Sequence, residues 1–129
     1  MIPDDFSGVQ RNVLGGPLGT CSDKPPTGFF RDGCCNTASE DRGGHTVCVV
    51  LTPEFLAFSN AHGNDLSTPC PEFDFPGLKP GDRWCLCAAR WREALAMNCA
   101  PRVVLNSTNE RALEIISLDD LKRYAIELN

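Results

Sequence analysis

The sequence predicts an α+β domain whose sheet is mixed or antiparallel. Apolar segments typical of strands interleave with amphipathic segments typical of helices, without the strict alternation of parallel α/β folds. The chain has 129 residues, of which 42% are hydrophobic, and this size and composition suit one globular domain. We assign residues 12–129 to that domain, and residues 1–11, which are polar and lack periodicity, to a flexible leader.

Five segments are expected to form strands, which gives a small sheet of about four or five strands. Residues 45–51 (HTVCVVL) are β-branched and apolar on both faces, as in a central strand. Residues 83–87 (RWCLC) form the next strand and lead directly into a helix. The shorter candidates are residues 27–31, 102–105 and 113–116.

Three helices are expected to pack with this sheet. Thr52 is placed to cap the first helix, with Pro53 at its first position and Gly63 as its C-terminal stop. The second helix covers residues 88–97, and Ser117 caps the third. The connection over residues 64–81 contains four prolines and two glycines, so we expect a long irregular loop. Loops of this length are often functional or pack down as lids.

Charge and hydropathy exclude two classes of partner. Twelve basic and 17 acidic residues give a net charge of −5, and no run of Lys or Arg occurs, so we expect no nucleic-acid partner. The longest apolar run, residues 47–51, is far shorter than the roughly 18 residues of a membrane span. The N-terminus also lacks the basic and apolar regions of a secretory signal. We therefore expect a cytoplasmic protein without a membrane partner.

Eight cysteines are the most informative feature of the sequence. In a reducing compartment thiols mostly stay free, so grouped cysteines indicate metal binding, redox chemistry or burial as small apolar side chains. No Cys-x-x-Cys pair, the usual unit of a zinc site, occurs. Cys85 and Cys87 would share one face of a strand with Cα atoms roughly 6.6 Å apart, which is too long for an unstrained disulfide. The adjacent Cys34 and Cys35 are too close for one.

Several segments, read together, carry a family resemblance. They are NVLGGPLGTCS, TGFFRDGCCNT, HTVCVVLTPEFLAFS, GNDLSTP and FPGLKPGDRWCLCAARWREA. They closely resemble a mainly bacterial, uncharacterised family catalogued as "domain of unknown function 2237". The resemblance runs from about Asn12 to Ala125 and implies a small two-layer α+β domain. It also implies that six cysteines belong to the family pattern: Cys21, Cys34, Cys35, Cys48, Cys85 and Cys87. It implies no activity.

The leading functional hypothesis is a site for zinc or another thiophilic metal. We expect it where the turn at residues 33–35 meets the strands at residues 45–51 and 83–88. Its candidate ligands are Cys34, Cys35, His45, Cys48, Cys85 and Cys87. A metal would deprotonate the thiols, and Arg31 or Arg83 would balance the resulting charge.

Two other hypotheses stay open. In the first, the cysteines are only core residues, and the protein is a metal-free module that binds a small molecule or a protein in a pocket under the long loop. Its candidate binding residues are Arg31, Asp65, Asp82, Arg83 and Trp84, together with His45. In the second, the protein is a thiol-based redox enzyme, although no general base is clearly paired with a cysteine. Whether the protein is an enzyme is left open by the sequence.

Overall fold

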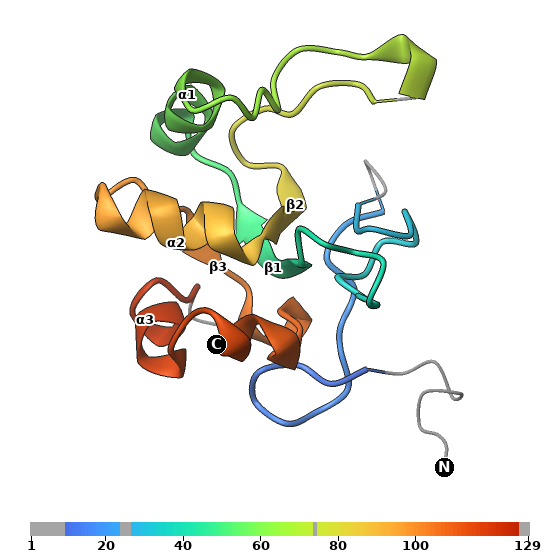
Figure 1. The fold of residues 1–129 in the computed structure, drawn as a ribbon, viewed down its shortest axis with the longest axis vertical. Coiled ribbons are helices and arrows are strands. Elements are labelled where there is room, and N and C mark those ends of the chain that lie inside the picture. The colour runs from blue at the N-terminus through green and yellow to red at the C-terminus, as the bar shows by residue number, and fades with distance from the viewer. Residues whose placement is uncertain (1–9, 24–26, 74, 127–129) are drawn as a thin grey trace.

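The computed structural model describes residues 10–23, 27–73 and 75–126, and within them it has an α+β fold (Figure 1). The strands found there are β1 (His45–Val50), β2 (Arg83–Cys87) and β3 (Arg102–Val103). The α-helices are α1 (Pro53–Ala61), α2 (Ala88–Ala96) and α3 (Leu118–Arg123). Short 3-10 helices, η2 (Pro71–Phe73), η3 (Leu105–Ser107) and η4 (Glu110–Glu114), lie in the connections.

The strands form one antiparallel sheet with β1 at its centre, in the order β2-β1-β3. The central position predicted for residues 45–51 is therefore confirmed. Cys48 of β1 lies opposite Cys85 of β2, and the register becomes irregular between His45 and Val47. The irregularity allows His45 to pair with Cys87 at the end of the sheet where α2 begins.

The helix boundaries follow the capping residues seen in the sequence. The Thr52 hydroxyl accepts a hydrogen bond from the Phe55 amide at 3.1 Å, and Pro53 opens α1. Likewise, the Ser117 hydroxyl accepts a hydrogen bond from the Asp120 amide at 3.2 Å at the start of α3. Both predicted caps are confirmed, because a cap depends on residues only a few positions apart.

Two predicted strands are absent from the described part of the chain, and the sheet is smaller than expected. Residues 27–31 form a turn, closed by the Arg31 amide donating to the Gly28 carbonyl at 3.0 Å. Gly28 and Arg31 have φ angles of +99° and +54°, which an extended strand does not allow. Residues 113–116 belong to η4 and the turn after it, where the Ile115 amide donates to the Ala112 carbonyl. The segment at 102–105 is a strand only over Arg102–Val103.

The side chains of the two long strands divide between two cores. The larger core contains Val47, Val49, Trp84 and Leu86 with apolar residues of all three α-helices, including the fully buried Trp91. The alternate strand residues Cys48 and Cys85 lie in a second cluster with Cys21, Cys35 and Val104. Because successive strand residues point to opposite faces, the helices cover one face of the sheet and the cysteines lie on the other.

Gln10 and Arg11, which we placed in the leader, make specific contacts. The Gln10 side chain donates to the Thr37 carbonyl at 2.9 Å and accepts from the Asn109 side chain at 2.6 Å. The Arg11 carbonyl accepts from the Glu110 amide at 2.9 Å. Residues 1–9 of the predicted leader lie outside the described residues. Of the helices that the structure describes, none has the length and apolar character to cross a membrane.

Candidate functional site

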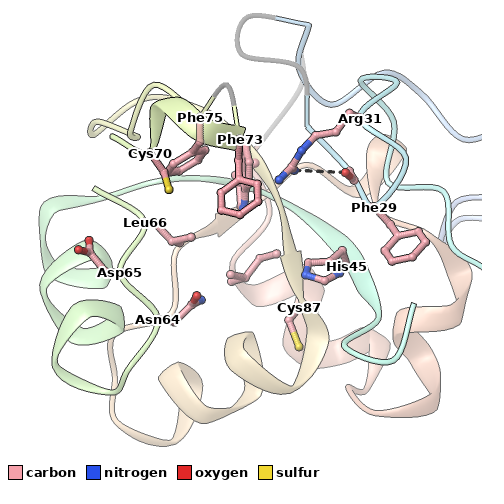
Figure 2. Close-up of a pocket in the computed structure, with 13 residues that line it drawn as sticks. Phe29, Arg31, His45, Asn64, Asp65, Leu66, Cys70, Phe73, Phe75 and Cys87 are labelled. Atoms are coloured by element: carbon pink, nitrogen blue, oxygen red, sulfur yellow. Dashed lines mark hydrogen bonds between the residues drawn. The ribbon is translucent and has the colours of Figure 1, made fainter. Parts of the chain in front are cut away.

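A cavity of about 370 Å³ lies where the sequence placed a pocket, beside the long loop (Figure 2). The segments that line it are the turn at residues 28–31, the start of β1, the end of β2 and parts of the loop at residues 64–75. Figure 2 shows Arg31 and His45 on one side of the cavity and Asn64 and Asp65 on the other. The volume falls within the range of about 300 to 1,000 Å³ typical of small-molecule sites.

Aromatic side chains supply much of the cavity wall. Phe75 from the loop packs edge-on against Trp84 of β2, with ring centroids 5.6 Å apart. Trp84 is buried, whereas Phe29 and Phe73 are 39% and 74% exposed at the opening. Exposed aromatic rings beside a buried one offer apolar surface to an incoming ring or planar group.

Arg31 brings a positive charge to this aromatic wall. Its guanidinium carbon lies 5.1 Å from the centre of the Trp84 ring, and Nη1 donates to the Gly28 carbonyl at 3.3 Å. None of the ion pairs within the described residues involves Arg31. Its φ of +54° is uncommon for a residue other than glycine and costs free energy. The turn thus holds at the cavity a cation that has no ion-pair partner among the described residues, in a strained backbone conformation.

His45 is fixed at the cavity by Asp41, a residue that sequence analysis missed. The Asp41 carboxylate is buried, and its Oδ1 lies 2.7 Å from His45 Nδ1. Its Oδ2 accepts from the His45 amide and from the Thr37 hydroxyl, both at 2.9 Å. Burial by itself raises the pKa of Asp41, but these hydrogen bonds outweigh it and the pKa is lowered overall. Asp41 therefore orients the imidazole, and among the described residues nothing forms a hydrogen bond with Nε2.

We predict that Asp41→Asn removes a pH-dependent part of the stability. Because the pKa of Asp41 is lowered on folding, its carboxylate stabilises the native state above the unfolded value of about 3.9. This contribution is lost as the pH falls through the folded value. Urea unfolding at pH 7 and pH 3 should show a difference between wild type and Asp41→Asn that shrinks in acid. An equal difference at both pH values would contradict this role.

Cys87 lines the cavity as a free, half-buried thiol. It is the register partner of His45, but its Sγ donates to the Gly43 carbonyl at 2.6 Å. Within the described residues, no hydrogen bond joins Cys87 to His45, so the histidine does not act on this thiol as a base in this structure. The sequence showed no general base clearly paired with a cysteine, and the geometry at Cys87 adds no such pair.

Of the other predicted ligand-binding residues, Asp65 lines the cavity, whereas Asp82 and Arg83 do not. Asp65 lines the cavity, but its carboxylate accepts hydrogen bonds from the Thr68 hydroxyl at 2.6 Å and from the Ser67 amide at 2.9 Å. The Thr68 bond is the main reason that the pKa of Asp65 is lowered. The Asp65 carboxylate therefore stabilises the conformation of its own loop through these hydrogen bonds. Asp82 accepts from the Lys79 amide in a turn, Arg83 is exposed at the start of β2, and neither lines the cavity.

The predicted metal ligands do not form one group. Cys35 is disulfide-bonded to Cys85, and Cys48 is disulfide-bonded to Cys21, with Cα separations of 5.3 and 5.8 Å. The expectation that these thiols are free is corrected, because each pair meets only after folding brings distant segments together. Cys34, Cys70, Cys87 and Cys99 are free. Burial is the main reason that the pKa of Cys34 is raised, and Asp32 and Asp23 raise it further.

Asp41, which holds His45, and Cys21, which is disulfide-bonded to Cys48, could hardly be recognised from the sequence. Asp41 precedes His45 by four positions, with the pair Gly43–Gly44 between them, a spacing that allows a tight return to the histidine. Cys21 appeared only in the family pattern and not among the candidate ligands. No local rule relates Cys21 to Cys48, since they are 27 positions apart.

These features define a class of protein: a small α+β domain with a cysteine cluster on one face of its sheet and an aromatic, cationic cavity bordering the other. The chain belongs to the family described as "Uncharacterized protein conserved in bacteria (DUF2237)", which matches residues 11–125. The family resemblance seen in the sequence is thereby confirmed. No curated protein matches the chain.

Proposed function

We propose that this protein is a binding module for a small organic anion that carries an aromatic or other planar group. The observation that supports it best is the Arg31 guanidinium, held over Trp84 at the cavity with no carboxylate partner among the described residues. A carboxylate matches the fork of N–H donors on a guanidinium, and aromatic walls favour a ring beside it. The cavity is large enough for such a molecule.

The balance of charge in the cavity favours an anion over a cation. Among the described residues that line it, Asp65 is the acidic one, and hydrogen bonds from its own loop occupy that carboxylate. Within the part of the chain that the structure describes, Arg31 has no acidic partner, and His45 Nε2 has no hydrogen-bond partner. A bound anion would therefore find one full positive charge and one adjustable hydrogen-bonding group.

The backbone of Arg31 gives a second, independent argument. A side chain at φ +54° costs about 1 kcal/mol or more relative to glycine, yet an arginine occupies this position. Residues held in sparsely populated conformations concentrate at ligand-binding sites, where the surrounding structure tolerates the cost. Binding at this turn would explain why a bulky charged residue is placed there.

The test uses benzoate as the anionic probe and benzamidine as its cationic counterpart. We expect benzoate to shift the amide NMR signals of residues around the cavity with a dissociation constant of about 1 mM, which corresponds to about 4 kcal/mol. Benzamidine should produce no such shifts at the same concentration. Arg31→Gly should weaken benzoate binding at least about tenfold, because it removes the guanidinium while suiting the backbone.

Arg83→Gln serves as the matched control, since Arg83 is exposed and lies outside the cavity lining. It should leave benzoate binding unchanged. Equal binding of benzoate and benzamidine, or equal losses in Arg31→Gly and Arg83→Gln, would contradict an anion site at Arg31. Because glycine is comfortable at this φ, unfolding is not an explanation for lost binding in Arg31→Gly.

A further inference from the structure

Four cysteines converge in the core on the face of the sheet away from the helices. Cys48 lies on β1 and Cys85 on β2, whereas Cys21 and Cys35 come from the irregular segments that precede β1. Their exposed fractions are between 0% and 3%. They are joined in two disulfides, Cys21–Cys48 and Cys35–Cys85.

The two disulfides lie against each other. The Sγ atoms of Cys21, Cys35 and Cys85 are all within 4.8 Å of one another. Cys48 is bonded to Cys21 and is the register partner of Cys85. Four thiolates around a tetrahedral zinc ion stand about 3.8 Å apart, given Zn–S bonds of about 2.3 Å. Once the S–S bonds open, small side-chain rotations would bring these sulfur atoms to that arrangement.

We propose that the reduced protein binds one thiophilic divalent metal ion, such as zinc, through Cys21, Cys35, Cys48 and Cys85. Two molecules of a dithiol reductant supply the four electrons and four protons that open the two disulfides, and each becomes a disulfide itself. The four resulting thiols then lose four protons as they bind the metal as thiolates. Two molecules of a disulfide oxidant, which take up the four electrons and four protons and become dithiols, would re-form both disulfides and release the ion.

This ligand set differs from the one that the sequence predicted. It keeps Cys35, Cys48 and Cys85 and adds Cys21. The other sequence candidates lie elsewhere: His45 and Cys87 line the cavity, and Cys34 has its Sγ 4.0 Å from the Thr20 hydroxyl. Within the described residues, the group able to gather three Cys, His, Asp or Glu ligands is that of Cys21, Cys35 and Cys85. Cys48 is not in that group and enters the proposed set as the disulfide partner of Cys21 and the register partner of Cys85.

Whether these four cysteines form disulfides or bind a metal would depend on how oxidising their surroundings are. Disulfides persist under oxidising conditions and are rare where thiols are kept reduced. In a reducing compartment the four cysteines would be thiols, and the two disulfide cross-links would be lost. A metal bound to the same four sulfur atoms would restore a link between the same four segments.

The experiment compares reduced and oxidised wild-type protein with Co²⁺ as the probe. One sample is reduced with dithiothreitol and desalted without oxygen, and the other is kept oxidised. We expect only the reduced sample to take up one Co²⁺ per chain and to show the intense absorption of tetrahedral cobalt–thiolate coordination. Zn²⁺ should then displace the cobalt and bleach this absorption. No uptake after reduction, or equal uptake by both samples, would overturn the proposal.

Variants and thiol labelling identify the ligands. Cys21→Ser and Cys48→Ser should each weaken Co²⁺ binding at least about tenfold, whereas Cys34→Ser and Cys87→Ser should not change it. Iodoacetamide labelling of the zinc-loaded wild-type protein, read by mass spectrometry, needs no variant that must fold. It should modify the other four cysteines and spare Cys21, Cys35, Cys48 and Cys85. Protection of Cys34 or Cys87 instead would refute this ligand set.

Discussion

Replacing Cys35 and Cys85 together with alanine is expected to lower the free energy of unfolding by about 4 kcal/mol under non-reducing conditions. The disulfide closes a separation of 50 residues, so its loss frees a large loop in the unfolded chain. The corresponding expectation for Cys21–Cys48, with a separation of 27 residues, is about 3.5 kcal/mol. Both exceed the effect of a typical surface substitution.

Urea unfolding in the presence of a chelator measures this effect without a contribution from bound metal. The matched control is Cys34→Ala with Cys99→Ala, which also removes two cysteines, both of them free and half-buried. This control should stay within about 1 kcal/mol of wild type. A Cys35/Cys85 variant as stable as the control would show that this disulfide does not stabilise the fold.

Gly28→Ala is expected to destabilise the protein by about 3 kcal/mol or more. The Cβ atom would overlap the carbonyl oxygen of Cys34, which belongs to the backbone and has little freedom to move. Gly28 also has a φ of +99°, a conformation that L side chains rarely adopt. The turn that carries Arg31 and the segment that carries Cys35 would be pushed apart, so benzoate binding should fall as well.

Gly15→Ala separates the cost of a positive φ from the cost of atomic overlap. Gly15 has a φ of +90°, but a Cβ atom there would meet nothing within 4 Å. It should therefore show only the backbone cost, about 1 kcal/mol. Thermal or urea unfolding should be measured for both variants. The destabilisation by Gly28→Ala minus that by Gly15→Ala gives the cost of the overlap with the Cys34 carbonyl. Equal effects of the two substitutions would mean that the contact between Gly28 and Cys34 is looser than the structure indicates.

The sequence by itself determined the elements whose signals are local. Thr52 and Ser117 start their helices because a cap joins groups three residues apart. Strand β1 was recognisable because both of its faces are apolar, and it is central because both are buried. One of the hypotheses that the sequence left open also expected a pocket under the long loop, and a cavity is found beside it. The loop's many prolines gave no indication of its shape.

The tertiary structure alone decided the chemistry of the sites. The segment at residues 27–31 has strand-like composition, but close packing of Gly28 on Cys34 favours a turn there and brings Arg31 to the cavity. Asp41 became a partner of His45 only through the return of the chain at Gly43–Gly44. Disulfide partners 27 and 50 residues apart depend on loop closure and on strand register, which no local pattern encodes. Cys85 consequently lies in the disulfide cluster, whereas Cys87, two positions later, lines the cavity.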